Sequence, residues 1–175
     1  MIRSEVRNGE LLLDLDGGWW DRTWRAITST VEGKPLKYFL TVKKLDGLFV
    51  SGAARVVSNG FKFDNFQLIL KGAGEIRMSG IEANNLDIEL PGAGLISLSG
   101  KATNQKVWLK GAGSYDAPRM ETENAVVKLH GVGKARVWVT GSLDADVDGI
   151  GHIEYHGNPD VKRSVSGLGK ISQSR

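Results

Sequence analysis

The chain has 175 residues, contains no cysteine and carries a formal net charge of +3, from 23 basic and 20 acidic residues. This length suits one domain, and the lack of thiols excludes disulfides and cysteine-based catalysis or metal binding. No apolar stretch is long enough to span a bilayer as a helix, and no run of five like charges indicates a nucleic-acid partner.

Residues 1–45 form a first region without a repeat. Glu10–Leu15 and Lys37–Val42 are predicted to be strands, separated by a loop that is rich in glycine and tryptophan. The start of the chain has no apolar segment behind it that could act as a signal peptide. We expect residues 1–45 to cap the amino end of the structure that follows.

Three tryptophans of this loop are the first candidate binding residues: Trp19, Trp20 and Trp24. They could form an aromatic platform for sugar rings or for a partner protein. They could equally fold back as a hydrophobic plug, which is the interpretation we favour at this point.

Residues 46–175 contain a Gly-x-Gly triplet that recurs every 18–20 residues, and a degenerate copy begins at Gly52. The position two residues before each triplet is always apolar. The position four residues before it is apolar except in the last repeat, where Arg163 stands. Apolar residues at every second position predict strands with one buried face. The six full triplets begin at Gly72, Gly92, Gly111, Gly131, Gly149 and Gly167.

A second column of short polar residues lies seven positions before each triplet. Asparagine suits a corner that leads into a strand, and stacked amide side chains could bond to one another. Glycine at both triplet positions permits positive φ and a sharp bend where a Cβ atom would clash. The column contains Asn65, Asn85, Asn104, Asn124, Ser142 and Asp160.

A fixed period of this length predicts an all-β fold, a single-stranded parallel β-helix of about seven coils, with an N-terminal strand and loop cap. Each repeat would be one coil, made of a strand, a glycine corner, a strand and a return loop. An antiparallel sandwich would not require the same residue column in every repeat. The two regions, 1–45 and 46–175, would form one structural domain.

The sequence contains no phosphate-binding glycine loop and no nucleophile elbow, and it predicts neither a cofactor nor a catalytic residue. The metal candidates are His152, Glu154 and His156, which share one face of a predicted strand. The favoured alternative is a solvated face on which Glu154 pairs with Arg136 of the preceding coil.

Two other groups on predicted strands face outward. Asp144, Asp146 and Asp148 could hold calcium, but lysines of the neighbouring coils are expected to neutralise them. Trp108 and Trp138 also occupy outward columns, where an exposed indole would indicate a contact surface.

The chain resembles a known family through the strand Phe39–Val42, the segment Leu48–Ala54, and the Ser-Gly and Gly-Ala-Gly motifs that continue to Lys170. It is similar, from about Asn8 to Ile171, to the bacterial domain described as putative auto-transporter adhesin, head GIN domain. The resemblance implies a β-helical domain of exported, often envelope-attached proteins, and it brings no established catalytic residues. It therefore implies a periplasmic or cell-surface location, and a truncated amino terminus would explain the missing export signal.

We accordingly expect a non-enzymatic module of adhesion or scaffolding, which binds a glycan or a surface protein through the tryptophan-rich loop or a flat sheet face. A polysaccharide-active enzyme is the alternative from another class, because parallel β-helices often carry such activities. A module that self-assembles end to end into a homo-oligomer is the third.

Overall fold

The computed structural model describes residues 2–7, 10–15, 37 and 39–174, and within these ranges it consists of strands and short connections. The chain divides into two compact units, Met1–Thr41 and Val42–Arg175. In the first unit, β1 (Ile2–Arg7) pairs antiparallel with β2 (Glu10–Leu15). The strand predicted for Glu10–Leu15 is thus confirmed.

The strand predicted for Lys37–Val42 is wrong. Residues 39–42 belong to no strand, and the side chain of Phe39 is 92% exposed. The alternation of apolar residues is present there, but no strand in the described ranges pairs with the segment, and a strand needs a partner for its backbone groups.

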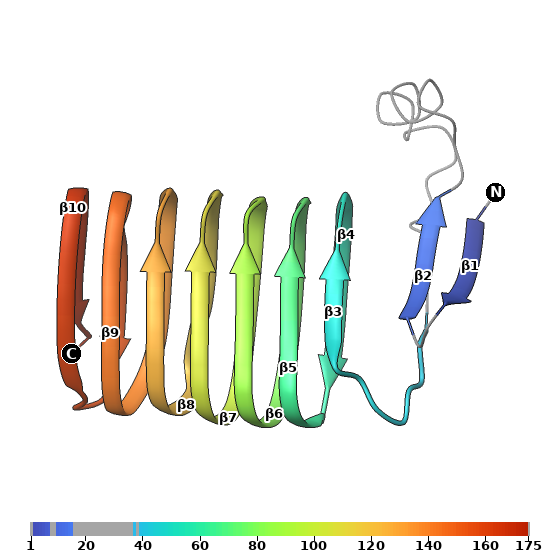
Figure 1. The fold of residues 1–175 in the computed structure, drawn as a ribbon, viewed down its shortest axis with the longest axis horizontal. Coiled ribbons are helices and arrows are strands. Elements are labelled where there is room, and N and C mark those ends of the chain that lie inside the picture. Colours follow the sequence, from blue (N-terminus) through green and yellow to red (C-terminus); the bar gives the residue numbers. More distant parts are fainter. Residues whose placement is uncertain (1, 8–9, 16–36, 38, 175) are drawn as a thin grey trace. The chain divides into compact units, whose positions relative to one another are not determined.

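The second unit is a parallel β-solenoid of about six turns, close to the predicted seven. Its strands pair in parallel in the order β10-β9-β8-β7-β6-β5-β3, with β4 on β6, and successive coils lie side by side in Figure 1. The predicted parallel β-helix is therefore confirmed. The strands are β3 (Gly47–Val50), β4 (Ala53–Asn59), β5 (Lys62–Leu70), β6 (Ala73–Leu90), β7 (Ala93–Leu109), β8 (Ala112–Leu129), β9 (Val132–His156) and β10 (Asp160–Gln173).

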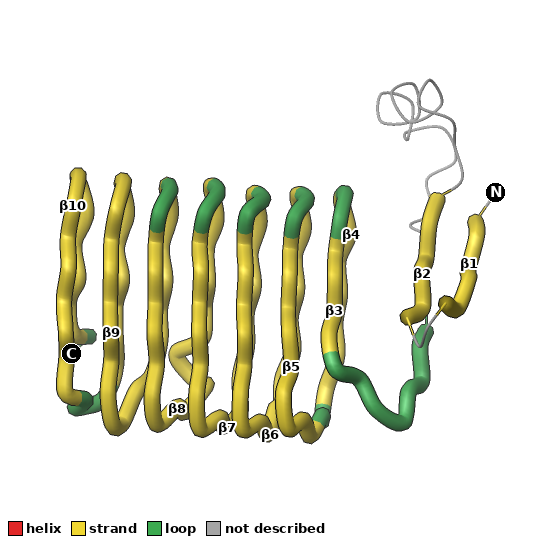
Figure 2. The backbone as a smooth tube through the Cα atoms, viewed as in Figure 1, coloured by secondary structure: helices red, strands yellow, loops and turns green. Residues whose placement is uncertain are grey.

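Each coil has two halves, which meet at the Gly-x-Gly corner. We call the strand segments before the corners the pre-corner half and those after them the post-corner half. In most coils the segment that leads to the next coil is also part of a strand. β6 and β8, for example, each run for 18 residues from the post-corner half of one coil into the pre-corner half of the next. The predicted return loops are therefore largely strand, and Figure 2 shows loop segments at the glycine corners of most coils. The pre-corner half comprises residues 47–50, 62–70, 82–90, 101–109, 121–129, 142–148 and 160–166, and the post-corner half residues 53–59, 73–79, 93–99, 112–117, 132–139, 150–156 and 168–173.

The core consists of the apolar columns that the repeat predicts. Equivalent residues of successive coils are direct register partners, as Leu90 and Leu109 are. Each fully buried aliphatic side chain contributes roughly 1.5–3 kcal/mol, and the stacked columns bury one in every coil. The buried residues two positions before the triplets are Val50, Leu70, Leu90, Leu109, Leu129 and Val147, and those two positions after them are Ile76, Ile96, Tyr115, Ala135, Ile153 and Ile171.

The triplet glycines are needed mainly for close approach between coils. Gly72 and Gly92 do not have positive φ, which among the full triplets occurs only at Gly149 and Gly167. A Cβ atom on Gly92 would lie 2.5 Å from the carbonyl oxygen of Lys71 and closer still to that of Gly72. The expected clash of a Cβ atom at the corner is therefore confirmed, while the positive φ that glycine permits is used only in the last two full triplets.

In the last coil, polar and exposed residues take the place of buried ones in the inward columns. Arg163 stands in an inward column, donates a hydrogen bond to the hydroxyl of Tyr155, and places its guanidinium carbon 5.4 Å from the centroid of that ring. Val165, which continues a buried column, is 48% exposed, and Leu168 is 79% exposed. Among the described strands, β10 is thus the outer edge of the stack.

One buried polar pair interrupts the apolar core. The side-chain amide of Gln105 donates a hydrogen bond to the hydroxyl of Tyr115, and both side chains are buried. Burial raises the pKa of Tyr115 well above its ordinary range, and the neighbouring charge of Asp116 raises it further. Tyr115 is therefore a neutral core residue at physiological pH.

Candidate binding surfaces

The outer face of the pre-corner half carries a column of side chains that changes character along the stack. Trp108 is in the middle of this column, is 39% exposed, and lies between the buried neighbours Val107 and Leu109. Its indole therefore points away from the core, as predicted from the alternation. In register order the column is Phe49, Ile69, Glu89, Trp108, Lys128, Asp146 and Ser164.

Three lysines surround Trp108. Lys106 on β7 and Lys110, the first residue after β7, lie two residues away on either side, and Lys128 on β8 and Glu89 on β6 are its register partners. The Nζ atoms of Lys110 and Lys128 are 4.5 Å and 5.6 Å from the indole centroid. These distances are in the range of cation–π contacts, so the indole is bordered by positive charge. We call Trp108 and the three lysines the Trp108 cluster.

The lysines of the cluster differ in their ion pairs. Lys110 lies 3.4 Å from a carboxylate oxygen of Glu89. In the part of the chain that the structure describes, Lys106 and Lys128 have no carboxylate within ion-pair distance, although Asp87 is the register partner of Lys106. Two of the three ammonium groups are therefore free to bind an anion.

An open groove of about 680 Å³ lies on the same half of the solenoid, and we call it the amide groove. One side is the predicted asparagine column, which forms a hydrogen-bonded ladder: the amide nitrogen of Asn104 donates to Asn85 over 3.0 Å, and that of Asn124 donates to Asn104 over 3.4 Å. Lys106 belongs both to the groove and to the Trp108 cluster. The groove is lined by Asn85, Asn104, Gln105, Lys106, Asn124, Ala125, Val126, Ser142, Leu143, Asp144, Asp160, Val161 and Lys162.

Two of the three aspartates that were considered for calcium contact side chains of neighbouring coils. Asp144 lies 3.7 Å from Lys162, and Asp146 lies 3.0 Å from Nε2 of His130. The hydrogen bond from His130, with smaller contributions from Ser164 and Lys128, lowers the pKa of Asp146. The contact of Asp144 with Lys162 agrees with the predicted neutralisation by lysine, whereas the partner of Asp146 is a histidine.

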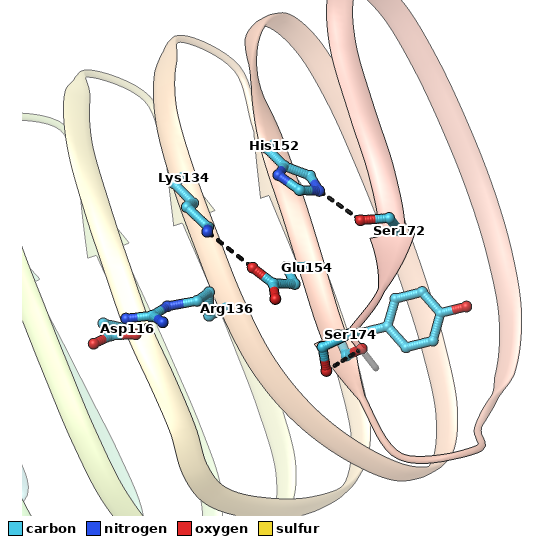
Figure 3. A network of polar contacts seen from close by, with 8 residues as sticks. Asp116, Lys134, Arg136, His152, Glu154, Ser172 and Ser174 are labelled. Atoms are coloured by element: carbon cyan, nitrogen blue, oxygen red, sulfur yellow. Dashed lines mark hydrogen bonds and ion pairs between the residues drawn. The ribbon is translucent and has the colours of Figure 1, made fainter.

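The post-corner half carries a second polar network, shown in Figure 3. Nζ of Lys134 lies 2.8 Å from a carboxylate oxygen of Glu154, and this ion pair lowers the pKa of Glu154. Arg136, the partner predicted for Glu154, instead pairs with Asp116, which lies opposite it in register. An ion pair between Glu154 and a basic residue of the preceding coil was thus predicted correctly. The basic residue is Lys134, which lies diagonally across from Glu154, and not Arg136, which lies directly opposite it.

The three metal candidates have separate protein contacts. Nε2 of His152 lies 2.6 Å from the hydroxyl of Ser172. His156 packs edge-on against the ring of Trp138, with 5.7 Å between centroids. Within the described ranges, no three His, Cys, Asp or Glu side chains are grouped closely enough to hold a metal ion. The proposed ligands His152, Glu154 and His156 are therefore held in place by neighbouring coils.

The other sequence-based candidates, Trp19, Trp20 and Trp24, lie outside the described residues. The sequence indicated the exposure of Trp108 but not the lysines around it, although the alternation Lys106, Trp108, Lys110 is visible in the chain. Lys128 is 20 residues away, and only register alignment could have placed it there. Nothing among the described elements is a helix long and apolar enough to cross a membrane.

Comparison with known proteins gives one family and one structure. Residues 1–159 match the model of the family described as "putative auto-transporter adhesin, head GIN domain", and this match ends immediately before β10. The crystal structure of a protein described as "a putative adhesin", from Bacteroides fragilis NCTC 9343, is similar with a TM-score of 0.82 and 25% sequence identity. The similarity covers 99% of this chain and 76% of that chain. No curated protein matches the sequence.

Proposed function

Because the chain belongs to the family described as putative auto-transporter adhesin, head GIN domain, we propose that it is a non-enzymatic adhesion module of exported, cell-surface proteins. We propose further that it binds its ligand on the outer face of the pre-corner half. The likeness to the Bacteroides fragilis structure supports the first part of this proposal.

The observation that carries the second part is the Trp108 cluster. A half-exposed indole on a regular strand is held on a hydrogen-bonded backbone, so little conformational entropy is lost when a ligand binds there. Tryptophan is also among the residues that contribute most to binding energy. The adjoining amide groove extends the same face with groups that both donate and accept hydrogen bonds.

The carboxylates support a binding role rather than catalysis. A general acid needs a pKa raised toward neutral pH. The two described carboxylates with a resolved shift, Asp146 and Glu154, have lowered pKa values, because His130 and Lys134 bind their charged forms. Both are therefore ionised at neutral pH, and each has a hydrogen-bonding partner on an adjacent coil.

The test is binding of the purified, fluorescently labelled chain to a glycan array and to intact bacterial and animal cells. We expect Trp108→Ala to reduce the bound signal at least tenfold, and Trp138→Ala, which removes the indole that packs on His156, to leave it unchanged once folding is verified by circular dichroism. A Trp19→Ala/Trp20→Ala double variant tests the tryptophan-rich loop separately. Loss of binding in that variant alone would move the site from the pre-corner half to the loop.

A further inference from the structure

The charge and shape of the pre-corner half specify a ligand class, and this step rests on the proposed function. We infer that the ligand is an acidic polysaccharide, with one sugar ring on the indole of Trp108, its anionic groups on Lys106, Lys110 and Lys128, and neighbouring sugars in the amide groove. The chemistry recognised is an anionic substituent on a pyranose ring.

The geometry places the cations around the indole rather than on one side of it. Same-face neighbours on one strand are about 6.5–7 Å apart, and adjacent strands are about 4.8 Å apart. Lys106 and Lys110 therefore flank Trp108 along the chain, and across the strands Lys128 flanks it on one side and Glu89 on the other. A ring that stacks on the indole would have its substituents within reach of all three lysines.

The patch combines lysines that have no ion pair with an exposed indole. Elsewhere on the solenoid, several basic side chains pair with acidic ones of an adjacent coil, as Lys62 does with Glu82 and Lys101 with Glu121, whereas Lys170 is also unpaired but has no tryptophan among its strand neighbours. At the cluster, Lys106 and Lys128 lack such partners, and only Glu89 neutralises Lys110. Their register partners Asp87 and Asp146 lie on the adjacent strands outside ion-pair distance, and an anionic ligand would give both ammonium groups a close partner.

The amide groove favours a polymer over a single sugar. Its lining residues extend across the strands from Asn85 on β6 to Lys162 on β10, so the groove runs along the axis of the stack. Asparagine amides donate and accept hydrogen bonds, which suits sugar hydroxyls. Lys106 connects the groove with the indole, so one extended chain can occupy both.

An acidic polypeptide is the competing polyanion, and the surface fits it less well. Extended peptides bind best along a free strand edge, where backbone groups pair. The Trp108 cluster lies on strands β7 and β8, which are paired on both sides. A peptide would find the same charges there, but no strand edge to pair with.

The experiment measures affinities by calorimetry for polygalacturonate, chondroitin sulfate, neutral dextran and poly-glutamate at two salt concentrations. We expect polygalacturonate or chondroitin sulfate to bind at least tenfold more tightly than dextran and poly-glutamate, and added salt to weaken that binding. Polygalacturonate carries carboxylates only and chondroitin sulfate carries both carboxylates and sulfates, so the comparison of the two shows whether sulfate adds to the affinity. Trp108→Ala should weaken binding at least tenfold, and Lys106→Ala and Lys128→Ala severalfold each.

Two variants serve as matched controls. Lys170→Ala removes one exposed lysine from the post-corner half, and Trp138→Ala removes the other tryptophan of the solenoid; both should bind as the wild type does. Equal binding of poly-glutamate, or equal loss in Lys170→Ala and Lys128→Ala, would overturn the inference by showing nonspecific charge attraction. Binding only to a neutral glycan or to a protein would overturn it while leaving the adhesion function intact. Failure of all glycan and cell binding would overturn the proposed function itself.

Discussion

The carbonyl oxygen of Gly72 occupies the space in which a Cβ atom on Gly92 would have to lie. The two glycines occupy the same corner position in successive coils, and the nitrogen of Gly92 donates a hydrogen bond to the carbonyl of Leu70 over 3.3 Å. The stack can therefore keep its strand spacing at the corner only if this position has no side chain.

We predict that Gly92→Ala destabilises the fold by at least about 2 kcal/mol, because the corner must open to admit the methyl group. The exposed neighbour provides the control, and Ala93→Ser should change stability by less than about 0.5 kcal/mol. Urea unfolding followed by circular dichroism measures both. Similar midpoints for the two variants would contradict the close-approach explanation.

The asparagine ladder should contribute measurably to stability although it lies at the surface. Asn104 donates to Asn85 and accepts from Asn124, so Asn104→Ala removes two hydrogen bonds at once. A net contribution of about 1 kcal/mol is expected from the loss. The adjacent Thr103→Ala, at an exposed position outside the ladder, should be nearly neutral in the same urea titration.

The ion pair of Glu154 and Lys134 predicts a pH-dependent stability difference. The pKa of Glu154 is lowered in the folded state from 4.5, so the ion pair stabilises the fold above that pH, and its contribution disappears as the pH falls through the folded-state pKa. Glu154→Gln should therefore be less stable than wild type at pH 7, by roughly 0.2–1 kcal/mol for such a partly exposed pair. The difference should shrink below the ordinary pKa of a glutamate. If the stability difference between wild type and Glu154→Gln in urea titrations stayed constant down to strongly acid pH, the stabilising role of the ion pair would be contradicted.

Arg163 is predicted to restrain end-to-end association. An inward-pointing charge on an edge strand prevents another chain from continuing the sheet. Arg163→Val restores the apolar column beside the exposed Val165, so we expect concentration-dependent oligomers in light scattering, whereas the wild type should associate less. Arg163→Lys, which retains the charge, is the matched control. Oligomers in Arg163→Lys equal to those in Arg163→Val would show that the guanidinium contact with Tyr155 matters, and not the charge.

Much of the solenoid follows from the repeat because the repeat fixes the register. Once the triplets are aligned, residues in the same column must stack, and the buried leucine columns and the Asn85–Asn104 ladder follow. Contacts that cross columns could not be predicted in this way. The diagonal choice of Lys134 by Glu154 depends on side-chain reach and on the competing pair of Arg136 with Asp116.

The hydrogen bond between the buried residues Gln105 and Tyr115 is a second contact between columns that the repeat could not predict. The two residues belong to different columns, and alternation alone places both among apolar neighbours. The Lys37–Val42 segment shows the reverse case, in which a strand-like pattern has no strand beside it in the described ranges. The same kind of pattern is a strand at Glu10–Leu15, where β1 supplies the partner, so alternation identifies a strand here only where a partner strand is present.

The most direct test of whether an acidic sugar binds at Trp108 uses the indole N–H signals in a nitrogen–proton correlation NMR spectrum. The chain has five tryptophans, and each gives one signal. Single substitutions to phenylalanine assign the signals, and purified trigalacturonate is the probe. We predict that the signal of Trp108 shifts in a saturable way while that of Trp138 remains in place. A shift confined to Trp19, Trp20 or Trp24, with Trp108 unchanged, would contradict it.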